Sequence, residues 1–127
     1  MIEIVAAVFE RDGRLLFGLR AAWKTWLPET WDLIGGHVEP GETPPESVGR
    51  EVAEEIGVRV TAAEPAAQFP YVRDDGEPVL QHVFRITASE GEPAIANEEH
   101  TALAWFTKAE AAALPNLAAR EYLGLFP

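Results

Sequence analysis

Three glutamates lie close together in a segment whose apolar spacing favours an amphipathic helix. On such a helix Glu51, Glu54 and Glu55 fall within an arc of about 100°, separate from an apolar stripe. Like charges at these spacings destabilise a helix by roughly a few tenths of a kcal/mol per pair, so this face favours a bound cation. Carboxylates are hard oxygen ligands, which suit Mg²⁺ or Mn²⁺. The apolar stripe consists of Val48, Val52 and Ile56.

The formal net charge of −11 limits the classes of partner. Nucleic acids and anionic membranes bind clustered Lys and Arg side chains, so neither is an expected partner. A polyphosphate would be repelled in the same way unless a divalent cation lay between it and the acidic residues. The charge is therefore compatible with a phosphate ligand that is held through a metal ion.

The length and composition indicate a globular protein. The chain has 127 residues, 47% of them hydrophobic, and no cysteine. These values predict one domain over residues 1–127, without a disulfide framework or a zinc–thiolate site. The first residues lack the features of a signal peptide, and no apolar run approaches the ~18 residues of a membrane helix. We therefore expect a cytoplasmic protein, and the sequence leaves open whether it is a monomer or a homodimer.

Local signals predict strands around one central helix. Thr43 and Glu46 have capping-box spacing and Gly57 suits a helix stop, so this helix is expected at about residues 44–56. A second helix follows Thr107 and stops at Pro115, and a last one is capped by Asn116. Two hairpins, a polar loop and a glycine-rich turn after the third strand join these elements. The expected strands cover residues 2–9, 14–20, 31–34, 79–88 and 103–106, and residues 58–72 are expected to form extended segments interrupted by prolines.

The residues around the glutamates form a longer pattern, which resembles the Nudix box over residues 36–58 without a mismatch. A solvated acidic face is the usual interpretation of an isolated amphipathic helix. Chance agreement at nine positions, however, is expected on the order of once in 10⁸ starts. The pattern is Gly36, five residues, Glu42, seven residues, and then Arg50, Glu51, Val52, Glu54, Glu55, Gly57 and Val58.

The resemblance to the Nudix family implies a fold and an activity. The fold is α/β (α+β), an α/β/α sandwich with a mixed β-sheet between helices. The box forms a loop–helix–loop that holds metal against a diphosphate. Members hydrolyse nucleoside diphosphates linked to another group, so the implied partner is a nucleotide and the implied cofactor is Mg²⁺, with Mn²⁺ as an alternative.

The resemblance also assigns roles to residues of the box. It implies that Glu51, Glu54 and Glu55 hold metal and water, together with the carbonyl of Gly35. Arg50 matches a position that orients a box glutamate, and a fork to Glu51 would fix that side chain in one rotamer.

Two assignments remain open at the level of sequence. Glu42 either braces the loop before the helix or interacts with the helix N-terminus. The general base is Glu51 or Glu54 from the box, or an acid from the late loop. In that loop we rank Glu98 slightly ahead of Glu99, and surface charge is the competing interpretation of both.

Substrate contacts are expected from cationic and aromatic side chains outside the box. Arg20 and Lys24 are candidates for phosphate, although a solvated hairpin charge also explains Arg20. Four aromatic residues can stack on a nucleobase or else serve in packing: Trp23, Trp26, Phe69 and Tyr71. The histidines have no spacing that suggests a catalytic or zinc cluster, so we interpret them as structural: His37, His82 and His100.

Three functions follow from these observations. The leading hypothesis is Mg²⁺-dependent hydrolysis of a nucleoside or deoxynucleoside triphosphate, normal or modified, to the monophosphate and pyrophosphate. An alternative in the same chemistry is an ADP-ribose or nucleotide-sugar pyrophosphatase. An alternative of another class is a non-catalytic module that senses nucleotides, and such modules commonly lose box glutamates that this chain retains.

Overall fold

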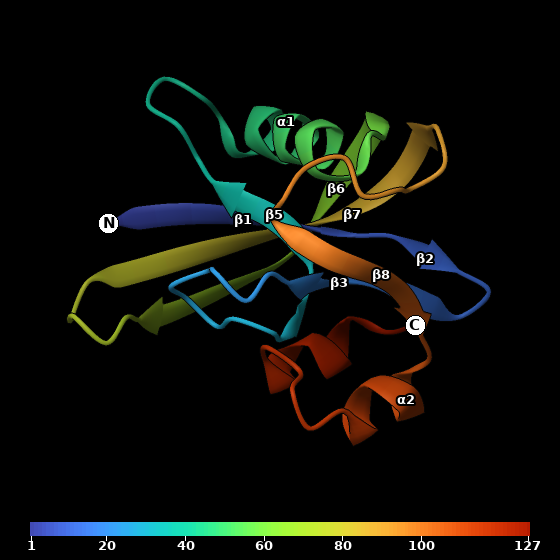
Figure 1. Cartoon of the computed structure of the whole chain (residues 1–127). Coiled ribbons are helices and arrows are strands. Elements are labelled where there is room, and N and C mark those ends of the chain that lie inside the picture. The colour runs from blue at the N-terminus through green and yellow to red at the C-terminus, as the bar shows by residue number, and fades with distance from the viewer.

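The computed structural model describes residues 1–127 and has two four-stranded sheets between helices (Figure 1). Helix α1 (Pro44–Ile56) covers one side, while α2 (Lys108–Ala113) and the 3₁₀ helix η1 (Arg120–Leu125) cover the other. None of the helices has the length and apolar character required to span a membrane. The strands are β1 (Ile2–Val8), β2 (Glu10–Arg11), β3 (Arg14–Arg20), β4 (Trp31–Asp32), β5 (Ile34–His37), β6 (Arg59–Val72), β7 (Pro78–Glu90) and β8 (His100–Phe106).

The larger sheet is mixed, which confirms the expected α/β/α sandwich. Its strand order is β5-β1-β7-β6, with β1 parallel to β7 and the other pairs antiparallel. The smaller sheet places β3 between β8 on one edge and the short strands β2 and β4 on the other. The sheets and helices together position the C-terminal half of α1 beside β5 and β8.

The predicted opening hairpin is only partly present. Its turn is present, with Asp12 at φ 53° and Gly13 at φ 77°, and Glu10 pairs with Leu15. Beyond the turn, however, β1 leaves β3 and pairs with β5 and β7 in the other sheet. The reason is burial, because residues 5–8 are buried without a break and such a run belongs at the centre of a sheet covered on both faces.

Alternating residues of β1 contribute to two cores, as the period of a strand requires. Val5 and Ala7 belong to a cluster with the apolar stripe of α1, whose three members are at most 1% exposed. Ala6 and Val8 belong to a second cluster with Phe17 of β3 and residues of η1. The same strand therefore fixes α1 on one side and the C-terminal segment on the other.

Helix α1 begins and ends where the sequence predicts. The hydroxyl of Thr43 accepts a hydrogen bond from the amide of Glu46, and the carboxylate of Glu46 accepts one from the amide of Thr43 at 2.9 Å. Gly57 takes the left-handed conformation, and its amide donates to the carbonyl of Ala53. These caps satisfy terminal backbone groups, so the bounds of α1 are encoded locally.

Three other strands differ from expectation. We expected prolines to interrupt residues 58–72, but β6 is continuous, with a register shift between Pro65 and Ala67. An edge strand tolerates proline because the missing donor faces no partner. The glycine-rich turn after residue 34 is also wrong at its start, since Gly35 and Gly36 continue β5 as far as His37. Strand β8 begins at His100, three residues before its expected start at residue 103.

At the C-terminus the first predicted helix is present, and the last one begins later than expected and lacks its predicted cap. Thr107 caps α2 with Glu110 in a capping box, and the helix ends before Pro115. Asn116 caps no helix, because its carbonyl accepts from the amide of Trp31 at 2.9 Å and its side-chain amide donates to the carbonyl of Glu29 at 3.0 Å. Residues 115 and 116 form a turn, Leu117 forms an isolated bridge with Trp31, and η1 begins only at Arg120.

Two glycines of the box region give a matched test of this local encoding. Gly49→Ala adds a methyl group to open space inside α1 and should raise the free energy of unfolding by about 0.5–1 kcal/mol. Gly57→Ala forces a side chain into a left-handed residue and should lower it by about 1 kcal/mol. Urea unfolding of both variants measures the difference, and changes of the same sign would contradict it.

Candidate active site

The carboxyl groups of Glu51 and Glu55 meet at the inner face of α1. Glu55 is 2% exposed, and its carboxyl group lies next to that of Glu51. Burial, reinforced by the neighbouring carboxyl group of Glu51 and its negative charge, raises the pKa of Glu55 to about 10. Two such acids remain together only when a proton or a cation neutralises part of their charge. The arrangement therefore fits a metal ion.

The glycines of β5 make room for this acid pair. A Cβ atom on Gly36 would lie 2.5 Å from an oxygen of the Glu51 carboxylate, and one on Gly35 would lie 1.9 Å from the carbonyl oxygen of Val5. Any side chain at residue 36 would displace Glu51, and any at residue 35 would separate β5 from β1. Gly35 thus allows β5 to pair closely with β1, and Gly36 allows the Glu51 carboxylate to lie against the backbone of β5.

Arg50 connects the acids of the box. Its Nε donates to Glu42 at 2.7 Å, and its Nη1 lies 3.1 Å from Glu51 and 3.2 Å from Glu54. A further bond from Nη2 to the carbonyl of His37 ties the guanidinium to the end of β5. The ion pair that we expected between Arg50 and Glu51 is therefore present, and Glu42 shares the same guanidinium.

Glu54 lies apart from the other two glutamates. Its side chain is 53% exposed and turned towards Arg50, whereas Glu51 and Glu55 face inwards. As a result, no group of three or more His, Cys, Asp and Glu side chains is arranged to hold a metal ion. The fit to a cation rests instead on Glu55, whose buried Oε2 has no hydrogen-bond partner in the protein.

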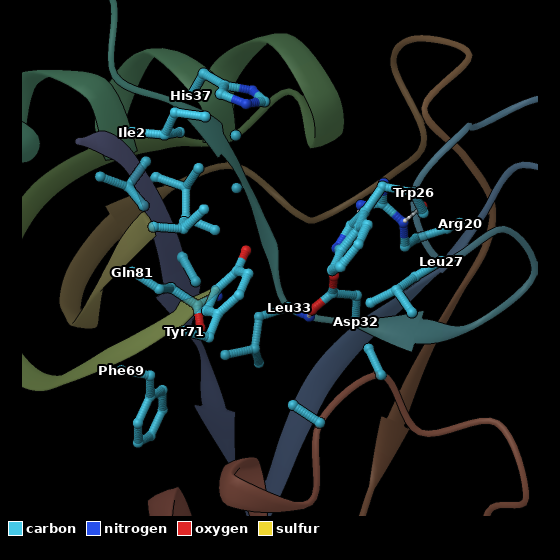
Figure 2. A pocket seen from close by; sticks show the side chains of 18 of the residues that line it. Ile2, Arg20, Trp26, Leu27, Asp32, Leu33, His37, Phe69, Tyr71 and Gln81 are labelled. Carbon is cyan, nitrogen blue, oxygen red and sulfur yellow. Dashed lines mark hydrogen bonds and ion pairs between the residues drawn. The ribbon is translucent and has the colours of Figure 1, made fainter. Parts of the chain in front are cut away.

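A cavity of about 900 Å³ opens beside Glu51 (Figure 2). Gly35, Gly36 and Glu51 line one end of it, together with Glu39 and Glu99. Figure 2 shows that side chains from the loop after β3 face side chains from β6 and β7 across the remaining space. Its volume suits a nucleotide-sized ligand. The cavity lining that Figure 2 labels is Ile2, Arg20, Trp26, Leu27, Asp32, Leu33, His37, Phe69, Tyr71 and Gln81.

The late loop presents Glu99, and not Glu98, to the cavity. Glu99 lines it and pairs with Lys24, and its backbone carbonyl accepts from the amide of Ala21 at 2.9 Å. Glu98 is exposed and belongs to a separate hollow beside Trp23. The bond from Ala21 fixes the chain direction at the start of β8, which turns the two neighbouring side chains to different sides. The geometry favours Glu99 where we had ranked Glu98 first.

Five of the six expected substrate contacts line the cavity. Trp26 and Tyr71 lie nearly parallel, with ring centroids 6.2 Å apart and 12° between their planes. Trp23 is the exception, because it is 62% exposed and its indole donates to the carbonyl of Glu98 at 3.1 Å, away from the cavity. The five that line it are Arg20, Lys24, Trp26, Phe69 and Tyr71.

A polar network in the cavity wall was not anticipated. The hydroxyl of Tyr122 donates to Asp32 at 2.7 Å and accepts from the side-chain amide of Gln81 at 3.0 Å. Arg20 lies 3.6 Å from the other oxygen of Asp32. Burial raises the pKa of Asp32, although Tyr122 and Arg20 oppose the shift. The one signal in the sequence was an acid inside the apolar run WDLI.

The histidines have three different environments. His37 is exposed at the cavity rim, and His82 contacts Glu3 at 2.8 Å. His100 is 6% exposed, and its Nδ1 lies 3.4 Å from Glu55. Burial lowers the pKa of His100 to about 4, so its imidazole is neutral at pH 7. The spacing of the histidines gave no sign of this position next to the acid pair.

Comparison with known proteins identifies relatives over nearly the whole chain. The profile of the NUDIX domain matches residues 2–125. The CTP pyrophosphohydrolase of Escherichia coli (strain K12) is 34% identical over 91% of this chain and 82% of that protein. The nucleoside triphosphatase NudI of Enterobacter sp. (strain 638) is 31% identical over 83% of this chain and 81% of that protein.

Solved structures share the fold. A MutT Nudix hydrolase from Burkholderia pseudomallei superposes with a TM-score of 0.82 and 28% identity, covering 94% of this chain and 91% of that one. The MutT protein from Methanosarcina mazei Go1 superposes with a TM-score of 0.86 and 26% identity, covering 98% and 91%. The arrangement of sheets and helices is therefore common to these proteins.

The fold, and the cavity beside the acid pair, define a hydrolase of phosphorus-containing acid anhydrides. The chain belongs to the Nudix family and is a Nudix pyrophosphohydrolase. Hydrolases of this family generally use divalent metal ions, which agrees with the environment of Glu51 and Glu55.

The contact between Gly36 and Glu51 predicts a loss of activity without a loss of fold. In Gly36→Ala the added Cβ would displace the Glu51 carboxylate, and hydrolysis should fall by at least about 10²-fold. Gly124→Ala is a matched control, because its added Cβ meets nothing within 4 Å. Turnover with excess Mg²⁺ measures the effect, and equal activity in both variants would refute it.

The bridge between Arg50 and Glu42 predicts a dependence of stability on pH. Hydrogen bonds from Arg50 lower the pKa of Glu42 from 4.5 to about 2. A depressed folded-state pKa stabilises the protein above the unfolded value, and this stabilisation is lost as the pH falls from about 4.5 to 2. The gap in unfolding free energy between the native chain and Glu42→Gln should therefore shrink over this range. Urea unfolding measures it, and a constant gap would contradict the prediction.

Proposed function

We propose that this enzyme hydrolyses a nucleoside triphosphate to the monophosphate and inorganic pyrophosphate in the presence of Mg²⁺, which Mn²⁺ can replace. The observation that carries the proposal is one cavity lined both by Glu51, whose carboxyl group lies next to that of Glu55, and by the aromatic pair Trp26 and Tyr71. The relatives named as a CTP pyrophosphohydrolase and a nucleoside triphosphatase act on substrates of this class.

The acidic end of the cavity is the proposed metal site. Glu51, Glu55 and the carbonyl of Gly35 would hold the ion, and Glu54 would join them from the outer face of α1. When bound, the cation neutralises diphosphate oxygens and acidifies water. Arg50 holds Glu51 and Glu54 through one nitrogen and so orders the two carboxylates.

Cationic side chains support the phosphates of the proposed substrate. Arg20, Lys24 and Arg73 line the cavity, and Lys24 is paired with Glu99. A phosphate oxygen competes with Glu99 for the ammonium group of Lys24. Substrate binding would therefore release the Glu99 carboxylate at the same time as it places a phosphate beside it.

Glu99 is the proposed general base. Water attacks one phosphorus of the substrate, its proton passes to the Glu99 carboxylate, and the bond from phosphorus to the bridging oxygen breaks. Attack at the α-phosphorus expels pyrophosphate with the bridging oxygen and the electrons of the broken bond, whereas attack at the β-phosphorus expels the monophosphate with them. The apolar and aromatic part of the cavity then serves the nucleobase, which stacks against Trp26 or Tyr71.

A product analysis tests the function. The purified chain is incubated with nucleoside triphosphates and with nucleotide sugars, each with Mg²⁺ and with EDTA, and both products are identified by mass. A monophosphate plus pyrophosphate from a triphosphate, seen only with the metal, is the expected result. Sugar phosphate as the preferred product would replace the proposal with the nucleotide-sugar alternative. No turnover of any substrate would refute the catalytic proposal and favour a nucleotide-sensing module.

The adjacent acids of the late loop provide a matched pair for the base. Glu99→Gln should lower kcat by roughly 10²–10⁴-fold, because a general base contributes about that much. Glu98→Gln should stay near the native rate, since that side chain is exposed outside the cavity. The pH profile of kcat separates loss of a base from loss of binding. A large defect in Glu98→Gln with none in Glu99→Gln would reverse the assignment.

A further inference from the structure

His100 lies against the acid pair with one unused ring nitrogen. The side chain is 5% exposed, and its Nδ1 lies 3.4 Å from Oε1 of Glu55. Neither this nitrogen nor Oε2 of Glu55 makes a hydrogen bond within the protein. Buried polar atoms without partners are costly, so two of them side by side indicate a site that is completed by something else.

The fold directs the imidazole at Glu55. The pairing of β3 with β8 shifts register between Leu19 and Arg20, so that Arg20 pairs with His100 and Thr101 is the extra residue. Bulges of this kind turn a side chain away from its regular direction. The ring then lies over Gly18, where a Cβ atom would come within 2.5 Å of its Cδ2. A glycine is required there for the ring to occupy this place.

The preceding loop holds His100 and Glu55 together from the other side. The amide of Ala96 donates to the carbonyl of Glu55 at 2.9 Å, and the amide of Ala94 donates to that of Ile56 at 3.1 Å. These bonds attach the loop to the last turn of α1, whose carbonyls lack partners within the helix. The helix and β8 thus cannot move apart without breaking them.

We propose that His100 is a positioning residue: when the divalent cation binds Oε2 of Glu55, the 3.4 Å contact between Nδ1 and Oε1 shortens to a hydrogen bond in which Nδ1 is the donor. The inference rests on the proposed metal site of Glu51 and Glu55. A carboxylate that binds metal is commonly oriented by a hydrogen bond to its other oxygen.

Three variants separate the hydrogen bond from simple packing. His100→Leu fills much of the ring volume without a donor, whereas His100→Asn places an amide nitrogen where Nδ1 stands. His82→Leu removes a histidine that contacts Glu3, away from the cavity, and serves as the control. The affinity for Mn²⁺ alone is measured by electron paramagnetic resonance, with circular dichroism to verify folding.

The expected result is a 10–100-fold weaker Mn²⁺ affinity in His100→Leu. His100→Asn should stay within about three-fold of the native chain and His82→Leu should be unchanged. If the affinity for Mn²⁺ were weakened equally in His100→Leu and His100→Asn, or in neither of them, the inference would be overturned. A native chain that binds no Mn²⁺ would instead refute the metal site itself.

The tautomer of His100 gives a second readout that does not depend on the variants. With Mg²⁺ bound, ¹⁵N-resolved NMR of the native chain should show the proton of His100 on Nδ1. A proton on Nε2 alone would refute the hydrogen bond to Glu55, even where the leucine variant fails to fold.

Discussion

The contact between the carboxyl groups of Glu51 and Glu55 is the constraint on which the site depends. Two acids so close, one of them 2% exposed, repel each other unless a positive charge or a proton is shared between them. No Lys or Arg side chain forms an ion pair with Glu55, and the carboxyl group is too deeply buried for water to screen its charge. The need for a proton or a cation at this place is therefore built into the packing of α1 against the sheets.

The surroundings hold this unfavourable pair in place. Arg50 binds Glu51 from outside, the missing side chain of Gly36 admits its carboxylate, and the loop before β8 is bonded to the end of α1. Each of these is a short-range contact, but they come from three separate parts of the chain. The folded structure thus keeps the carboxyl groups of Glu51 and Glu55 closer together than they would stay on an isolated helix.

Prediction from sequence succeeded where the signals are local. The caps of α1 at Thr43 and Gly57 fix its bounds within the segment itself, and the spacing of the box glutamates follows from the helical period. The partners of β1 could not be predicted, because pairing depends on burial from both sides. Asp32 and His100 were missed for the same reason, since their neighbours Tyr122 and Glu55 are distant in sequence.

The parallel pairing of β1 with β7 bears on how the chain acquires its shape. Ile2 pairs with Val79, so the hydrogen bonds between β1 and β7 can form only after more than half of the chain has been synthesised. Contacts of such long range close large loops and slow folding relative to helical proteins. Helix α1 precedes β7 and β8 in the chain, so the strand that places His100 against Glu55 is synthesised only after the helix that carries the acid pair.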